Sequence, residues 1–167
     1  IGELTASLQR VGARKFETLP LEQLAWAVTG LTEACVLAGD AGQLGSLREE
    51  ATAALVSRAE DSGLFAEEGK RRNAHAAPVG NQFHVLNSLC QTMRADSGTE
   101  TAGLAQSLAT ALLELQRPDG SWPGLVDPQR GEAAALYPVL TVTQIALAPI
   151  ALRVAGGRTR REVDLRQ

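Results

Sequence analysis

A histidine and two aromatic residues on predicted helices are the side chains of this sequence that could most directly bind a ligand. His84 is the only histidine in a predicted helix, and an imidazole can accept a hydrogen bond or exchange a proton near neutral pH. Packing against a neighbouring helix is its alternative role. We expect Trp26 and Phe83 to pack in the core or else to line an apolar cavity. The candidate ligand-binding residues are His84, Trp26, Phe83, Asn87, Tyr137 and Gln144.

Carboxylates between the predicted helices could do acid–base chemistry if two of them were paired. In glycosidases two carboxylates flank the bond that is cleaved, so a sugar-active enzyme is one hypothesis for this set. The spacing of the residues selects no particular pair. The carboxylates are Asp61, Glu67, Glu68, Asp119, Asp127 and Glu132.

Two basic segments could bind anions or lie free in solvent. The run at residues 70–72, Lys-Arg-Arg, could bind a phosphate or an acidic partner, and a solvated loop is the alternative. The segment 158–167 contains four arginines, offset by Glu162 and Asp164. We expect this segment to be a flexible, solvated C-terminal tail.

The sulfur and imidazole groups do not form a recognisable metal site. Cys35 and Cys90 lie in apolar helical stretches, so we expect buried free thiols. Neither cysteine belongs to a C-x-x-C motif or a Cys/His cluster, and His75 is separated from His84. We therefore predict no metal and no cofactor.

The composition is that of a globular chain with a helical core. Of the 167 residues, 44% are hydrophobic and 21% charged, but only 4% are aromatic. A core made mostly of Leu, Ala and Val favours helices. The net charge of −3 argues against a nucleic-acid partner. No apolar run is long enough to span a bilayer and no signal peptide is visible, so a cytoplasmic location is the default expectation.

The apolar residues recur at helical spacing in six segments. A single domain over residues 1–157 is predicted, before the basic tail. Ser46 is the expected N-cap of the third helix, Pro149 is expected to kink the sixth, and Gly156-Gly157 to end it. The predicted helices are 4–13, 21–38, 44–59, 81–94, 100–116 and 141–155.

Two halves of the chain share landmarks in the same order. Gln23, Gln82 and Gln144 lie near the starts of three predicted helices and recur about 60 residues apart. An acidic residue, a glycine and an aromatic residue form a turn at 61–65 and again at 119–122. Repeated helix pairs of this period indicate stacked or circular hairpins.

The second turn resembles the QW repeat of triterpene cyclases and protein prenyltransferases. Gln116 ends a helix, and Asp119, Gly120 and Trp122 form the following turn. The glutamine amide can bond free backbone groups at the helix end, and the indole can seal the hairpin. The first copy departs from the pattern, since an arginine, at position 58, replaces the glutamine, and a phenylalanine, at 65, stands near the tryptophan position. The stretch 137–150 also resembles the entry into an inner helix of this group.

The resemblance implies an all-α fold, a partial or small α/α toroid of about six helices. The second, fourth and sixth helices would be inner ones. Six helices make half of a full ring, so the domain would be truncated, open, or completed by another subunit as a homo-oligomer. The long segments 63–79 and 118–138 both precede inner helices, so we expect them on one face, beside a pocket.

The resemblance also bears on function. The chain lacks the Asp-x-Asp-Asp acid motif of class II terpene cyclases and a zinc-ligand set. We therefore expect a toroid-like domain that binds an apolar or prenyl-type small molecule or a protein partner. Two alternatives remain open: an enzyme, terpene-cyclase-like or sugar-active, completed by residues outside this chain, and a purely structural helical scaffold.

Overall fold

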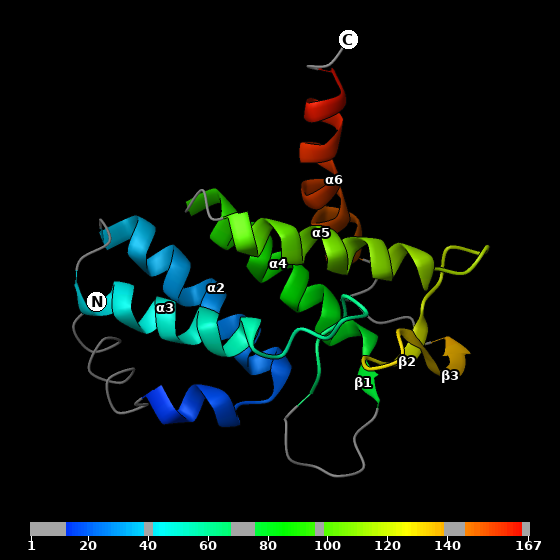
Figure 1. Cartoon of the computed structure of the whole chain (residues 1–167), viewed down its shortest axis with the longest axis horizontal. Helices are drawn as coiled ribbons and strands as arrows, with labels where there is room; N and C mark the ends of the chain where they lie inside the picture. Colours follow the sequence, from blue (N-terminus) through cyan, green and yellow to red (C-terminus); the bar gives the residue numbers. More distant parts are fainter. Residues whose placement is uncertain (1–12, 39–41, 68–75, 96–98, 139–145, 165–167) are drawn as a thin grey trace.

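The computed structural model describes residues 13–38, 42–67, 76–95, 99–138 and 146–164. Within these ranges the chain is mostly helical, as predicted, and it also contains a small sheet that the sequence did not predict (Figure 1). The helices are η1 (Ala13–Thr18, a 3-10 helix), α2 (Leu21–Ala38), α3 (Gln43–Val56), α4 (Val79–Ala95), α5 (Thr99–Glu114) and α6 (Ala148–Asp164). The strands are β1 (Ala77–Pro78), β2 (Pro123–Asp127) and β3 (Glu132–Pro138).

The helices form two successive pairs, and α4 joins the first pair to the second. α2 packs against α3, and α4 packs against α5. α4 also contacts α2 and α6, so these three helices follow one another in space, with α3 and α5 in front of them in Figure 1. Leucine, alanine and phenylalanine side chains fill the space between them. The largest fully buried side chains are Phe16, Phe65, Phe83, Leu21, Leu24, Leu31, Leu55, Leu64, Leu86, Leu89, Leu108 and Leu112.

The bounds of α2, α4 and α5 lie within two residues of the predicted ones. α3 starts within one residue of the predicted position and ends three residues before it, but its N-cap is Gly42 rather than Ser46. Ser46 already lies in the first turn, and its N–H donates to the Gly42 carbonyl at 3.2 Å. Gly42 has φ 58°, a conformation that glycine adopts without steric strain. The capping-box prediction was therefore wrong.

The last helix also differs from the prediction. α6 starts at Ala148, so Pro149 stands in the first turn, where its missing N–H and fixed φ are tolerated. The predicted kink in the helix interior is therefore wrong. The helix continues through Gly156 and Gly157 to Asp164 instead of ending at the glycines. Positions 158–164 of the predicted tail are thus helical. The predicted first helix lies almost entirely outside the described residues, as does the start of the predicted sixth.

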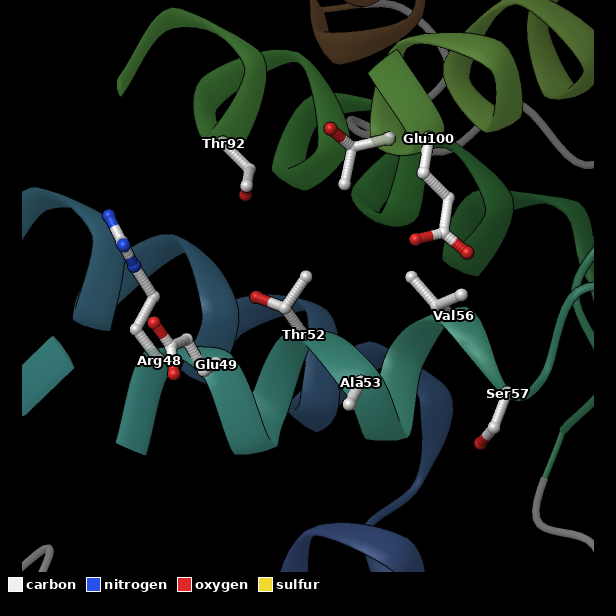
Figure 2. Close-up of a pocket in the computed structure, with 9 residues that line it drawn as sticks. Arg48, Glu49, Thr52, Ala53, Val56, Ser57, Thr92 and Glu100 are labelled. Carbon is white, nitrogen blue, oxygen red and sulfur yellow. The ribbon is translucent and has the colours of Figure 1, made fainter. Parts of the chain in front are cut away.

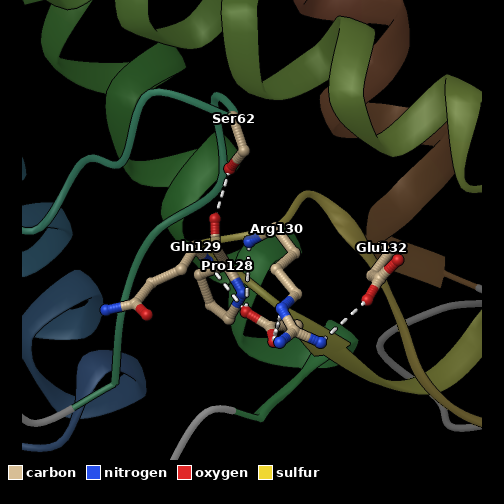
Figure 3. A network of polar contacts seen from close by, with 6 residues as sticks. Ser62, Pro128, Gln129, Arg130 and Glu132 are labelled. Carbon is tan, nitrogen blue, oxygen red and sulfur yellow. Dashed lines mark hydrogen bonds and ion pairs between the residues drawn. The ribbon is translucent and has the colours of Figure 1, made fainter.

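The two long segments meet in the small sheet. β1, from the first segment, pairs antiparallel with β2, from the second, and β2 pairs antiparallel with β3. The β2–β3 turn is held by Asp127, whose Oδ1 accepts the N–H groups of Gln129 (3.0 Å) and Arg130 (3.2 Å). Ser62, from the turn after α3, donates its hydroxyl to the Pro128 carbonyl (Figure 3). The described parts of the two segments therefore meet in one sheet, whereas the pocket expected beside them is not among those found, which lie between the helices.

The turns after α3 and α5 have the same main-chain hydrogen bonds. In each turn a first N–H donates to the carbonyl four residues later, and the N–H three residues later donates back to the first carbonyl. Gly63 and Gly120, at the same place in the two turns, both have φ 83°. The bonds, all 2.9 Å, are Glu60 to Leu64 and Gly63 to Glu60, then Arg117 to Ser121 and Gly120 to Arg117.

One polar side chain stabilises each turn in the same way. The Leu64 N–H donates to Ser62 Oγ at 3.1 Å, and the Ser121 N–H donates to Asp119 Oδ1 at 2.9 Å. Ser62 is therefore the counterpart of Asp119, one residue away from the Asp61 that the spacing suggested. The shared geometry supports the predicted repeat of helix pair and turn.

Candidate functional site

The QW-like turn after α5 has a structural role. Gln116 Nε2 donates to the Gly120 carbonyl at 3.0 Å, and Trp122 Nε1 donates to the Leu112 carbonyl at 2.7 Å. The Trp122 ring is buried and meets Phe83 edge-on at 5.1 Å between ring centroids. The Ser121 hydroxyl and amide that donate to Asp119 lower the pKa of that carboxyl. The turn therefore joins the end of α5 to the side of α4.

The first turn uses other residues for the same task. The shared turn geometry places Ala59, rather than Arg58, at the position of Gln116. Arg58 reaches back to η1, and its guanidinium donates to the carbonyls of Glu17 (3.0 Å) and Leu19 (2.7 Å). Phe65 is fully buried, and its N–H and carbonyl are both bonded by the Gln82 amide, at 2.9 and 2.8 Å. Gln82, recognised in the sequence only as a repeat landmark, thus clamps the turn to α4.

Trp26 and His84 lie together on the solvent-exposed side of α2 and α4. Trp26 is 54% exposed, so the expectation that it packs in the core was wrong. Its position explains this, because Trp26 stands two residues after the buried Leu24 and therefore about 200° around the helix from it. Trp26 Nε1 donates to His84 Nδ1 at 3.2 Å, and the two rings meet edge-on at 5.5 Å.

His84 is held from both ends of its ring. Its Nδ1 accepts from Trp26, while its Nε2 lies 3.5 Å from Glu22 Oε1. Partial burial lowers the pKa of His84, and the Glu22 carboxylate opposes this shift. The Nδ1 atom must be unprotonated to accept the indole N–H, so the geometry favours neutral His84 with its proton on Nε2. Asn87 lies half-buried one turn further along α4.

The α2–α4 face continues from Trp26 and His84 to a small polar pocket. The pocket, of about 240 Å³, is lined by residues of both helices. Thr32 Oγ1 and Gln91 Oε1 are buried there without a hydrogen-bond partner. Trp26 on α2 contacts His84 on α4, and further along both helices Thr32 meets Gln91 at the pocket. The contacts advance in the same direction along both helices, so α2 and α4 run parallel. The other lining residues are Glu33, Val36, Arg94 and Ala95.

A larger pocket, of about 470 Å³, opens between α3, α4 and α5 (Figure 2). Its α3 side presents Ala53 and Val56, and charged side chains stand at its ends, Arg48 on α3 and Glu100 on α5 (Figure 2). Its volume suits a small ligand. Most of its lining surface is apolar, but the pocket is open, and charged and hydroxyl side chains stand around it. The remaining lining residues are Glu49, Thr52, Ser57, Thr92 and Thr101.

The other predicted site residues do not join the Trp26–His84 pair. Phe83 is fully buried against Trp122, which makes it a core residue. Tyr137 is 57% exposed on β3. Gln144 lies outside the described residues, as do His75 and the basic run 70–72. Cys35 and Cys90 are buried and not joined in a disulfide, as expected.

Loop carboxylates mainly hold the main chain in place. Glu67 accepts the Leu21 N–H at the start of α2 (3.3 Å) and the Asn81 side-chain amide. Asp127 holds the β2–β3 turn, and Asp119 its own turn. These roles account for three of the acidic residues that the sequence left as candidates for catalysis, and none of the three is placed beside His84.

Sequence reasoning did not single out Glu22, Thr32 or Gln91. A signal for Glu22 was present, because it stands four residues before Trp26 and therefore on the same helix face. Thr32 and Gln91 carry no such signal, since their meeting depends on the packing of α2 against α4.

The chain matches no protein-family model, no curated protein and no solved structure. Within the described ranges, no three His, Cys, Asp or Glu side chains gather closely enough to hold a metal ion. Among the same residues, no helix combines the length and apolar character needed to cross a lipid bilayer. The class that the structure defines is a mostly helical domain of paired helices with a small sheet.

Proposed function

We propose that this chain is a binding domain that recognises a protein partner through the α2–α4 face, centred on Trp26. The observation that carries the proposal is the Trp26 ring, half exposed yet fixed by its bond to His84. Tryptophan is among the residue types that contribute most to protein–protein binding energy. A ring already held in place also loses little side-chain entropy on binding.

The arrangement of the helix pairs supports the choice of this face. In a toroid of the kind that the QW-like turn resembles, α2, α4 and α6 would be the inner helices. The α2–α4 face would then line the interior of a ring that further helices, or another copy of the chain, complete. Trp26 and His84 are the inner-helix candidates that the structure brings together.

An apolar or prenyl-type ligand has less support. The pocket of suitable size is mostly apolar but open, and Arg48, Glu49 and Glu100 stand in its lining, so part of an isoprenoid bound there would face charges. Catalysis by His84 is also less well supported, because Trp26 occupies its Nδ1 and Glu22 faces its Nε2. Binding therefore explains the geometry better than either alternative.

The test is selection of a random phage-displayed peptide library on the whole chain. Each enriched clone is then measured on the native chain, on Trp26→Ala and on Trp26→Phe. We expect clones that bind the native chain at least tenfold more tightly than Trp26→Ala, with Trp26→Phe in between because it keeps an aromatic ring. Leu113→Ala, at an exposed position on α5, is the matched control. Clones that bind Trp26→Ala as tightly as they bind the native chain would overturn the proposal.

A further inference from the structure

We infer that the segment bound at the α2–α4 face is an extended basic peptide whose main-chain amide is held by Thr32 and Gln91. The inference rests on the proposed function and names the partner's chemistry. It starts from two buried oxygens, Thr32 Oγ1 and Gln91 Oε1, that have no hydrogen-bond partner and line the same pocket from facing helices.

Such atoms are unfavourable in the free protein. Thr32 is 1% exposed, and a buried polar group without a partner lowers stability. A peptide unit supplies both missing partners, since its N–H can donate to Gln91 Oε1 and its carbonyl can accept from the Thr32 hydroxyl. Both oxygens are closed off from solvent in the free protein, so the two side chains turn toward the pocket on binding and then complement one amide group.

The size of the pocket agrees with a peptide unit. At about 240 Å³, it is smaller than the roughly 300–1,000 Å³ typical of sites for drug-sized ligands. Such a pocket accommodates part of a longer ligand, the rest of which lies along the helix face.

The distance to Trp26 sets the length of the bound segment. Gln91 stands seven residues after His84, and Glu33 seven residues after Trp26. Two helical turns correspond to about 10 Å, and an extended chain advances about 3.3 Å per residue. A residue three positions from the bound amide therefore reaches the Trp26 ring.

The charge beside Trp26 selects a basic residue there. Glu22 lies one turn before Trp26 on the same helix face. A cation over an indole ring is attracted by the ring's quadrupole, and the Glu22 carboxylate adds to this attraction. Glu33 and Arg94, of opposite charge, both line the polar pocket at the other end, so the basic residue has a preferred end of the groove.

Isothermal titration of the whole chain with seven-residue acetylated, amidated peptides tests the inference. The peptides contain Gly and Ala with one variable position, occupied by Arg, norleucine or Glu. We expect the Arg peptide to bind at least tenfold more tightly than the other two and to shift the Trp26 fluorescence. N-methylation of the amide three residues from Arg should weaken binding at least fivefold. Equal binding of all three peptides would overturn the inference.

Thr32→Val separates a binding role from a purely structural one. Valine has the same shape without the unpartnered hydroxyl. Thr32→Val should therefore raise the unfolding midpoint and lower the affinity for the Arg peptide at least threefold. Ser88→Ala is the matched control, because Ser88 Oγ is also buried without a partner but does not line the pocket. Ser88→Ala should stabilise the chain and leave peptide affinity unchanged.

The two proposals can fail separately. Trp26-dependent phage clones whose affinity is unchanged in Thr32→Val and that lack basic residues would refute the extended basic peptide and leave the binding face standing. Clones that ignore Trp26 altogether would refute the binding face itself.

Discussion

His84 shows how one residue's protonation is tied to the position of another. In its neutral form, Nδ1 accepts the Trp26 indole N–H at 3.2 Å. A proton on Nδ1 removes this acceptor, and the ring would then present a donor to a donor. Glu22, 3.5 Å from Nε2, favours the charged form, but desolvation is the larger effect and the pKa of His84 is lowered from 6.5.

The lowered pKa predicts that His84 reduces stability in acid. Between the ordinary pKa of 6.5 and the lower folded-state value, the unfolded chain binds more protons than the folded chain, so the free energy of unfolding falls as pH decreases. Urea denaturation at a series of pH values measures this. The Trp26 fluorescence of the folded chain should change over the pH range in which folded His84 is protonated.

His84→Asn is the control, because asparagine offers an acceptor near Trp26 but does not titrate. The acid-side loss of stability should be smaller in this variant, because the two chains differ only at position 84. Identical pH profiles for the two chains would contradict the assignment to His84.

Gly63 and Gly120 differ in their surroundings although they share φ 83°. A Cβ at Gly63 would lie 2.9 Å from the Ser107 carbonyl oxygen on α5, whereas at Gly120 it would meet nothing within 4 Å. Gly120→Ala should lower the free energy of unfolding by about 1 kcal/mol, from the left-handed backbone alone. Gly63→Ala should lower it by about 2–4 kcal/mol, because a main-chain contact must also yield. Equal losses in urea denaturation would mean that α5 moves away without strain.

At the level of elements, glutamine amides connect each turn to its neighbours in different ways. Gln82, fully buried on α4, bonds both main-chain groups of Phe65. Gln116 makes one bond, to the Gly120 carbonyl, near solvent. The two copies of the repeat therefore have the same turn geometry, but different residues anchor them. This is why the QW-like motif is evident in the second copy and not in the first.

Gln82→Leu is expected to be far more destabilising than Gln116→Leu. The first leaves a buried N–H and a buried carbonyl without partners, each worth about 1–3 kcal/mol, for a loss of about 2–6 kcal/mol. The second loses one solvated bond, about 1 kcal/mol or less. Urea midpoints of the two variants measure the difference. Losses of similar size would show that burial does not decide the strength of the clamp.

The three strands carry no signal in the sequence pattern. β1 has two residues, too few for a periodic signal, and neither β2, with five residues, nor β3, with seven, alternates apolar and polar side chains. β1 and β2 pair through Ala77 with Val126 and Pro78 with Leu125, residues that are far apart in sequence. Strand formation at such sites depends on the partner strand rather than on local preference, so the sequence pattern indicated only loops.

For the whole molecule, α4 is the element on which the others converge. It contacts α2, α5 and α6, together with β1 and β2. Its buried face includes Phe83, Leu86 and Leu89. Elements surrounded on several sides open last, because their exposure requires the loss of many contacts at once.

Hydrogen exchange should therefore be slowest in α4. Mass spectrometry of exchanged, pepsin-digested chain is expected to show α4 peptides exchanging with a free energy close to that of global unfolding. Peptides from the β2–β3 hairpin should exchange faster, since that sheet contacts the helices mainly through β1 and β2. Slower exchange in the hairpin than in α4 would contradict this ranking.

The sequence by itself determined the helical class, the bounds of α2, α4 and α5, and the order of helix pair and turn. These follow from local periodicity and from glycine and proline at the turns, which act within one helix or loop. Tertiary structure alone decided that β1 joins β2, that Gln82 holds Phe65, and that Thr32 meets Gln91. Each of these joins segments distant in the chain, and their contact depends on how whole elements pack. The exposed Trp26 was within reach of the sequence, since it lies off the apolar stripe, but its partner His84 was decided by the packing of α2 against α4.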